Sequence, residues 1–359
     1  MSEHGKHEAA DSGVDIVPTE TRASFGAEVL DAVTPRTVLM VVAVLLLQLG
    51  FILSYVGAFH APKPHRIPIG VVAPGGAAGQ LVGQLNAIAG RPVDARAVAS
   101  TSSATGQLRH GTLPAALVVD PSGNTDTLLV SSGGGTSVSQ AITQVITAVE
   151  AKQQRSATVQ DVVPLQPGDG RGLTGFYLVI GWIVGGYLMA ALLGVARGAR
   201  PATPRRAVIR LLSVLPYALL SGIGGAWLVG PVLHALTGHF LALAALGTLL
   251  VITSAAVTMA LQVLLGVIGI GLTVLVFVVL GNPSAGGAYQ PSVLPGFWRT
   301  ISYALPNGAG TDTVRRIMYF GSRGITGHLA VIAGWAIAGV LVTLAVAVLR
   351  QRRGAAEPA

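Results

Sequence analysis

The sequence GNPSAGGAYQPSVLPGFWRTISYALPNGAGTDTVRRIMYF, residues 281–320, lies between two of the most apolar runs of the chain. It is rich in glycine, proline and aromatic residues and carries little charge, although a loop between membrane helices is usually short and polar. Its large apolar side chains include Leu294, Phe297, Trp298 and Ile317. This composition is typical of short helices that dip into the edge of a membrane, rather than of an exposed linker.

The composition of the whole chain excludes a soluble globular protein. Hydrophobic residues make up 51% of the sequence and charged residues only 11%, and several apolar runs are long. Such runs need about 20 residues to cross a hydrocarbon core roughly 30 Å thick. The net charge of +8 comes from cations beside these runs, which favours membrane lipids over nucleic acid as partners. The absence of cysteine excludes disulfides and cysteine-ligated metals.

We predict an α-helical polytopic membrane protein with six transmembrane helices. The apolar runs lie at residues 38–56, 173–195, 208–233, 240–260, 263–280 and 325–349. The fourth and fifth form one block, and an unbroken helix of that length, at about 1.5 Å per residue, would be nearly twice as long as the membrane is thick. We therefore expect a tight hairpin near Gln262.

Arginine residues in the short loops predict the orientation, because cytoplasmic loops carry an excess of Lys and Arg. Five arginines and no acidic residue lie in or beside the loop between the second and third spans: Arg197, Arg200, Arg205, Arg206 and Arg210. Three more follow the sixth span. Both regions, and with them both termini, are expected in the cytoplasm of a multi-pass cell-membrane protein. Residues 55–172 and 281–324 then lie outside.

The N-terminal region is predicted to contain three parts. Residues 1–20 have few large apolar side chains and are expected to form a disordered cytoplasmic tail. In residues 21–36, apolar side chains recur at helical spacing, which indicates an interfacial amphipathic helix, with a frayed linker as the alternative. The first span is placed at 37–58. A cleaved signal peptide is the alternative for this span, but more than thirty mainly polar residues precede the apolar run.

Residues 59–172 are predicted to be an extracellular α/β domain inserted between the first two spans. Short strands are expected at 66–73, 92–99, 115–120, 128–131 and 158–164, with helices between them. The Gly-rich sequence at 133–137 lacks the lysine of a Walker A loop, so we interpret it as the approach to a helix N-terminus. The remaining spans form a bundle at 173–350 that contains the external re-entrant segment 281–322, and 351–359 form a cytoplasmic tail.

The predicted spans contain few chemically active side chains. No Asp or Glu lies in their apolar core, which disfavours a transporter coupled to protons or sodium ions. The eight histidines are scattered, and no HExxH or catalytic triad pattern is present, so we expect no enzyme, no metal site and no cofactor. Gly181 and Gly185 form a GxxxG pair, followed by Gly186, and such residues let helices pack closely.

The predicted order of elements resembles that of ABC-2-type transporter permeases, in the branch with a large extracellular domain that includes phage-infection-protein-like membrane proteins. The order is an interfacial helix, one span, a large external domain and five further spans. The arginine-rich loop and the external motifs at 281–289, 294–298 and 305–309 carry the resemblance, which covers residues 20–350.

The resemblance implies the permease subunit of an exporter for a hydrophobic or amphiphilic substrate, powered by a separate ABC ATPase subunit. It also implies pairing with a second copy or a related permease. The five arginines named above would couple to the ATPase, although they could equally serve only as determinants of topology. An alternative function is a membrane receptor or scaffold whose external domain binds a cell-envelope, secretion or phage partner.

The resemblance further implies that residues 281–322 form a re-entrant gate at the external end of the transport path. The residues carried over as gate candidates are Asn282, Pro283, Gly286, Gly287, Pro295, Phe297 and Trp298. Irregular backbone at membrane depth is tolerated only against protein or a wet cavity, which suits the glycine and proline breaks. An external cap, anchored structurally by its aromatic residues at the interface, is the alternative.

Overall fold

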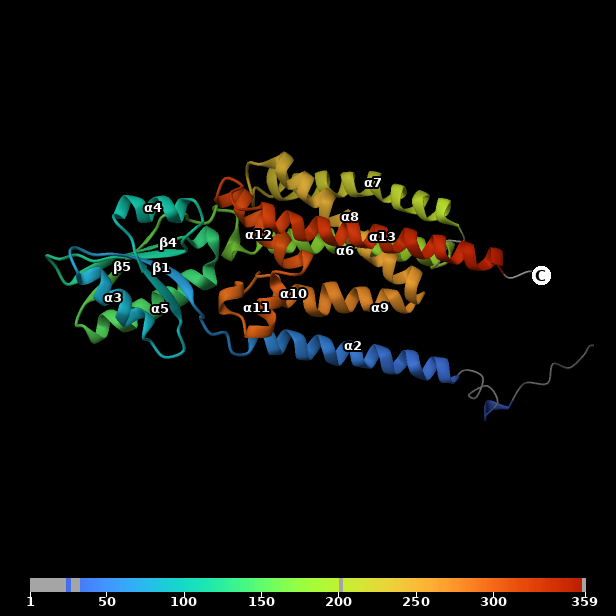
Figure 1. Ribbon diagram of the computed structural model, residues 1–359, viewed down its shortest axis with the longest axis horizontal. Coiled ribbons are helices and arrows are strands. Elements are labelled where there is room, and N and C mark those ends of the chain that lie inside the picture. Colours follow the sequence, from blue (N-terminus) through green and yellow to red (C-terminus); the bar gives the residue numbers. More distant parts are fainter. Residues whose placement is uncertain (1–23, 27–32, 200–202, 357–359) are drawn as a thin grey trace, which may run out of the picture. The chain divides into compact units, whose positions relative to one another are not determined.

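The computed structural model describes residues 24–26, 33–199 and 203–356 (Figure 1). Two compact units are present, Met1–Leu46 and Leu47–Ala359. The helix α2 (Pro35–Phe59) begins in the first unit, and the second unit contains all the elements that follow it. The predicted tail at 1–20 and most of the predicted interfacial helix at 21–36 lie outside the described residues.

The protein is mostly helical, with a small α/β sheet region. In the described part of the chain, five helices are long and apolar enough to cross a membrane: Thr37–Phe59, Thr174–Arg197, Pro204–Val232, Phe240–Leu265 and Thr326–Arg353. The predicted span at 263–280 corresponds to a shorter apolar helix, Ile268–Ser284. Its length is roughly 25 Å, somewhat less than the thickness of a hydrocarbon core.

The chain turns between the helices Phe240–Leu265 and Ile268–Ser284 at Gly266, and not at Gln262. Gln262 lies inside α8 (Phe240–Leu265), whereas Gly266 has φ of 67° and ends the helix. Only glycine adopts this backbone conformation without a steric cost, so its position decides where the hairpin forms. The next helix continues through α9 (Ile268–Val274), the π-helical turn η4 (Leu275–Leu280) and α10 (Gly281–Ser284).

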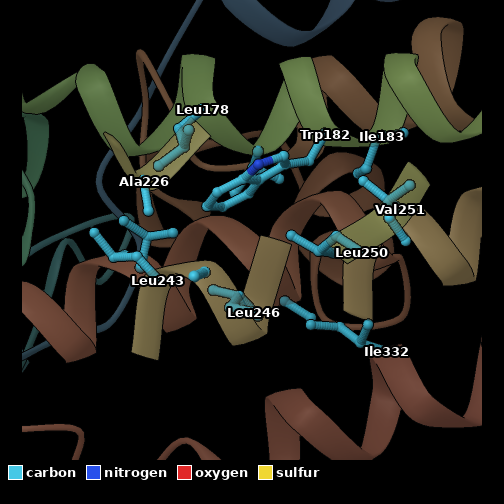
Figure 2. Close-up of a cluster of buried hydrophobic side chains, with 14 of the residues drawn as sticks. Leu178, Trp182, Ile183, Ala226, Leu243, Leu246, Leu250, Val251 and Ile332 are labelled. Atoms are coloured by element: carbon cyan, nitrogen blue, oxygen red, sulfur yellow. The ribbon is translucent and has the colours of Figure 1, made fainter. Parts of the chain in front are cut away.

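The helix α8 lies at the centre of the helical bundle. It packs against α6 (Thr174–Arg197), α7 (Pro204–Trp227) and α13 (Thr326–Ala356), which run beside it in Figure 1. Figure 2 shows the indole of Trp182 among Leu178, Ala226 and Leu246. Its Nε1 donates a hydrogen bond of 3.1 Å to the carbonyl of Ser221.

Small residues allow the close approach of α6 to its neighbours, but not all glycines of the predicted motif take part. A Cβ at Gly186 would collide with the side chain of Ser254 and the carbonyl of Val251. A Cβ at Gly185 would lie 2.9 Å from the hydroxyl of Tyr217, whereas one at Gly181 would meet open space. The tightest helix contact on α6 near this motif therefore lies at Gly186.

The sheet has five strands in the order β2-β1-β3-β4-β5, with β3 and β4 antiparallel and the other pairs parallel. The strands are β1 (Ile67–Val72), β2 (Val93–Ala97), β3 (Ala115–Val118), β4 (Thr125–Val130) and β5 (Ser156–Asp161). All five coincide at least in part with predicted strands. The helices α3 (Ala77–Asn86) and α5 (Thr136–Lys152) share one hydrophobic core with the sheet.

A further helix, α4 (Thr101–Arg109), packs in a separate core and was not predicted. Its sequence is mostly polar, and only Ala104 and Leu108 are buried. The hydroxyl of Ser100 accepts a hydrogen bond of 3.1 Å from the backbone N–H of Ser103 and thereby caps the helix. Two buried side chains in nine residues give too weak a periodic signal to be recognised in the sequence.

The segment 281–320 forms short helices, most of which are buried. After α10 come the 3-10 turn η5 (Pro291–Val293), α11 (Gly296–Ser302) and α12 (Pro306–Tyr319). α12 begins with proline at its first position, where the missing N–H costs nothing. At the other end of the bundle α13 continues to residue 356, so the predicted tail at 351–359 begins as helix.

Candidate functional site

A cavity of about 420 Å³, lined by both apolar and charged side chains, lies beside α12. Almost every residue of α12 is buried, and the two charged residues Asp312 and Arg316, one turn apart, are among its few partly exposed positions. Both line this cavity. Its other walls include Val138 of α5, Gln290 before η5 and Tyr303 at the end of α11.

The carboxylate of Asp312 is the centre of a cluster of charged side chains. Arg316 Nε donates a hydrogen bond of 2.7 Å to Asp312 Oδ2, and His328 Nε2 lies 3.1 Å from the same oxygen. Arg315 Nη1 lies 3.6 Å from Asp312 Oδ1. Because Arg315 and Arg316 follow Asp312 by three and four residues, one helix brings all three together.

Backbone carbonyls hold both guanidinium groups in place. Arg315, only 8% exposed, donates from Nη2 to the carbonyl of Gly286 at 2.9 Å. Arg316 donates from Nη1 to the carbonyl of Arg323 at 3.2 Å. The cluster therefore ties α12 to the turn after α10 and to the loop before α13.

The cluster carries a positive charge. Burial alone would raise the pKa of Asp312, but the guanidinium groups of Arg315 and Arg316 outweigh this effect and hold that pKa below its usual value. The carboxylate is therefore ionised at neutral pH. Arginine stays protonated in proteins, so two cations face one anion, and His328 adds a further cation when it is protonated.

The cavity lies near one end of the apolar helices. His328 is in the first turn of α13. On α12, Val314 lies next to Gly175 in the first turn of α6, where a Cβ on the glycine would be 2.8 Å from the valine side chain. Arg197 ends the same 24-residue helix, roughly 35 Å further along. The charged cluster and the arginine-rich turn are therefore at opposite ends of α6.

Several hydrogen bonds join the sheet region to the segment that forms the cavity. Gln290 Oε1 accepts a hydrogen bond of 3.1 Å from the backbone N–H of Ser137, at the start of α5. Tyr319, the last residue of α12, donates its hydroxyl hydrogen to Asp169 Oδ2 at 2.6 Å. Asp169 Oδ1 also accepts from the backbone N–H of Thr174, where α6 begins. These bonds fix the sheet, α12 and α6 to one another.

The predicted coupling arginines lie in different environments. Arg197 ends α6, and Arg205 and Arg206 are exposed in the first turn of α7. Arg210 is half-buried and donates from Nη2 to the carbonyls of Arg197 and Gly198, at 2.9 and 2.7 Å. Arg210 thus stabilises the turn between α6 and α7, whereas Arg205 and Arg206 are open to a partner. Arg200 lies outside the described residues.

Most of the predicted gate residues are packed inside the protein. The buried ones are Asn282, Pro283, Gly286, Gly287 and Trp298, whereas Pro295 is half-buried and Phe297 is 59% exposed. Only the carbonyl of Gly286 takes part in the charged cluster, through its bond from Arg315. Trp298 packs with Ala58 at the end of α2.

Asn282 belongs to a separate buried polar contact. Its Oδ1 accepts a hydrogen bond of 3.0 Å from Asn307 Nδ2, which also donates to the carbonyl of Phe277 at 3.0 Å. Asn307 is completely buried, and its Oδ1 has no hydrogen-bond partner within the described part of the chain. The π-helical turn η4 contains Phe277, so this contact satisfies a carbonyl at an irregular part of the helix.

The sequence did not indicate the charged cluster. The segment was interpreted from its apolar residues, and His328 was one of several scattered histidines. The available signal was the spacing of Asp312, Arg315 and Arg316, which places an acid and two bases on neighbouring positions of a helix. Nothing in the sequence links His328 to them, since it belongs to another helix.

In the parts of the chain that the structure covers, no three His, Cys, Asp or Glu side chains are grouped so that they could hold a metal ion. No family model matches the sequence, and no curated protein or solved structure matches it significantly. The chemistry of these side chains is thus the basis for any functional proposal.

Proposed function

We propose that the chain is the permease subunit of an ABC-2-type exporter for an amphiphilic substrate, powered by a separate ATPase. The observation that supports this best is the position of the cation-rich cavity near one end of the apolar helices, with the arginine-rich turn at the other end of α6. A substrate with an apolar part and a charged group has complementary surroundings there, because apolar helices begin beside a cavity with charged side chains on its wall.

The proposed topology has six spans and an external sheet domain. The helix Ile268–Ser284 would complete the six, since a shorter helix can be accommodated by local thinning of the bilayer. Arg197, Arg205 and Arg206 favour a cytoplasmic α6–α7 turn in the cell membrane. Both termini then lie in the cytoplasm, and the sheet domain and the cavity face the outside.

Arg205 and Arg206 are the proposed contacts with the ATPase. They are exposed at the start of α7, whereas Arg210 is engaged by the carbonyls of the turn. The turn they occupy begins where α6 ends, and α6 reaches α12 at its other end. A displacement of the turn by the ATPase could thus be transmitted along α6 toward the cavity. The exporter is proposed to work as a pair, with a second copy or a related permease.

Purification of the tagged chain from its native membrane tests the proposal. We expect an ATPase to co-purify and to hydrolyse ATP faster in the lipid-reconstituted complex than alone. Replacing Arg205 and Arg206 with Glu should remove this stimulation without lowering the thermal unfolding temperature. The control replaces Arg352 and Arg353 with Glu, which reverses the same number of exposed charges near the end of α13.

The exporter proposal fails if no ATPase co-purifies and the reconstituted protein stimulates no ATP hydrolysis. That result would favour a receptor or scaffold, whose external domain binds a cell-envelope, secretion or phage partner. Stimulation that persists at wild-type level in the Arg205→Glu, Arg206→Glu variant would instead show that these arginines only determine topology.

A further inference from the structure

The side chains that line the cavity beside α12 carry a net positive charge, which favours the binding of an anion. Among its lining residues, Asp312, Arg315, Arg316 and His328 are the side chains that can carry charge. Two guanidinium groups face one carboxylate, which leaves a positive charge in a partly enclosed space. A charge withdrawn from water is costly unless it is paired, so a bound anion would stabilise the cluster.

The two arginines are already oriented for such a ligand. Arg316 is held by Asp312 and the carbonyl of Arg323, and Arg315 by the carbonyl of Gly286. Each guanidinium has five N–H donors, more than these contacts require. Its planar arrangement of donors matches the paired oxygens of a phosphate or carboxylate group. Because the protein fixes these side chains in advance, little conformational entropy is lost when the anion binds.

The position of the cavity favours phosphate over carboxylate. His328 lies in the first turn of α13, and Val314 contacts Gly175 in the first turn of α6. The cavity is therefore at the level where the apolar helices begin, which is the level of lipid headgroups and their phosphates. Tyr303, 60% exposed, lines it as well, and tyrosine commonly lies at the membrane–water interface.

We propose that this cavity binds the phosphate group of a phosphate ester, with Arg315 and Arg316 as donors to its oxygens. A volume of about 420 Å³ accommodates such a group together with a glycerol-sized substituent. The inference names the ligand class of the proposed exporter and rests on that function for its biological meaning. Binding itself needs no ATPase and can be measured on the chain alone.

Calorimetric titration of the purified full chain in a non-ionic detergent tests the proposal with three probes. They are a short-chain phospholipid (dihexanoyl phosphatidylglycerol), glycerol 3-phosphate and hexanoate. We expect at least one phosphate ester to bind about tenfold more tightly than the carboxylate. A phospholipid that binds more than about threefold tighter than glycerol 3-phosphate identifies a lipid as the source of the phosphate, and otherwise the source is a soluble ester.

Substitutions separate a binding site from a merely structural cluster. Arg316→Gln should raise the Kd of the phosphate ester about tenfold, because it removes one charge-assisted contact. Arg109→Gln removes the same charge from an exposed position on α4 and should leave the Kd within about twofold. Asp312→Asn removes the competing carboxylate and should lower the Kd, an effect that partial unfolding cannot produce.

The inference is overturned if folded Arg316→Gln protein keeps the wild-type Kd, if hexanoate binds as tightly as the phosphate esters, or if none of the probes binds. Its failure can be distinguished from failure of the proposed function. A chain that stimulates its ATPase but binds no phosphate ester contradicts only the inference. A chain that binds the ester but has no ATPase partner contradicts only the exporter proposal.

Discussion

Gln290 caps the helix α5 at Ser137, although the two residues are 153 positions apart in the chain. Gln290 Oε1 accepts hydrogen bonds from the backbone N–H groups of Ser137 and Val138, at 3.1 and 3.3 Å. The hydroxyl of Ser137 accepts from the backbone N–H of Gln290 at 3.1 Å. Gly135, with φ of 148°, leaves the space in which the Gln290 side chain lies. The segment 281–320 thus completes the sheet domain.

Gln290→Ala should weaken the start of α5. Two buried N–H groups would lose their acceptor, at a cost of about 1–2 kcal/mol in the free energy of unfolding. Hydrogen exchange at Ser137 and Val138 should become faster. Gln160→Ala, at an exposed position of β5, is the matched control and should leave exchange unchanged. Wild-type protection in the Gln290 variant would mean that the cap contributes nothing.

Tyr319→Phe should loosen the contact between α12 and the loop before α6. Burial, followed by the neighbouring carboxylate of Asp169, raises the pKa of Tyr319, so the hydroxyl stays protonated and keeps donating to Asp169. Its loss should cost about 1–3 kcal/mol, because it leaves a partly buried carboxylate oxygen without this donor.

The Tyr319 effect is measured as a decrease in the thermal unfolding temperature and as faster exchange at the amide of Gln166, which donates to the tyrosine oxygen at 3.3 Å. Tyr177→Phe serves as the control, since Tyr177 is 62% exposed. Equal unfolding temperatures for the two variants would contradict a stabilising role of the hydroxyl.

Glu150 should make the stability of the sheet domain depend on pH. Burial raises the pKa of Glu150 to about 7, and the nearby carboxylate of Asp126 adds to this shift. Burial would also raise the pKa of Asp126, but hydrogen bonds from Arg155 and from the backbone of Asp120 hold it below its usual value. Arg155 Nε donates to Asp126 at 3.1 Å and lies 3.6 Å from Glu150.

Between pH 4.5, the ordinary value for Glu, and about 7 the folded protein retains a proton on Glu150 that the unfolded chain has released. The stability of the sheet should therefore fall as the pH rises through this window and level off above it. Exchange of β4 and β5 amides, corrected for intrinsic rates, measures this slope. Glu150→Gln should flatten it, whereas Asp94→Asn at an exposed site should not. An unchanged slope in Glu150→Gln would rule out Glu150 as its cause.

Gly186→Ala should disrupt the packing of α6 on α8, because the new methyl group would collide with Ser254 and the carbonyl of Val251. We expect a loss of about 1–3 kcal/mol. Gly181→Ala lies on the same helix and meets open space, so it should be neutral or stabilising by up to about 1 kcal/mol. Thermal unfolding in detergent, followed by tryptophan fluorescence, compares the two. Similar losses for both variants would contradict the close contact at Gly186.

The broad architecture could be predicted from the sequence because it follows from long-range patterns. Apolar runs of membrane length identified the five long helices, and alternation of short strands with helices identified the sheet. The length of the apolar block predicts a hairpin but not its exact position, which the backbone geometry at Gly266 decides, four residues after Gln262. α4 was missed because only Ala104 and Leu108 reach its core.

The charged cluster was less accessible to prediction. The spacing of Asp312, Arg315 and Arg316 is visible in the sequence. It brings the three side chains together only if the segment that begins at Pro306 is a helix. The contribution of His328 depends on how α13 packs beside α12. Contacts between helices that are separated by a loop follow from tertiary packing, which a single sequence does not specify.

The proposed export of an amphiphile, driven by ATP, can be measured directly in membrane vesicles. Inside-out vesicles of the native membrane receive a fluorescent short-chain phospholipid from the outside, and the measured quantity is the fraction that becomes protected from an external quencher when ATP is added. We predict ATP-dependent protection in vesicles with the wild-type chain, and its loss in the Arg316→Gln variant and in the Arg205→Glu, Arg206→Glu variant. Equal protection with and without ATP, or with and without the chain, would show that the chain does not export the phospholipid.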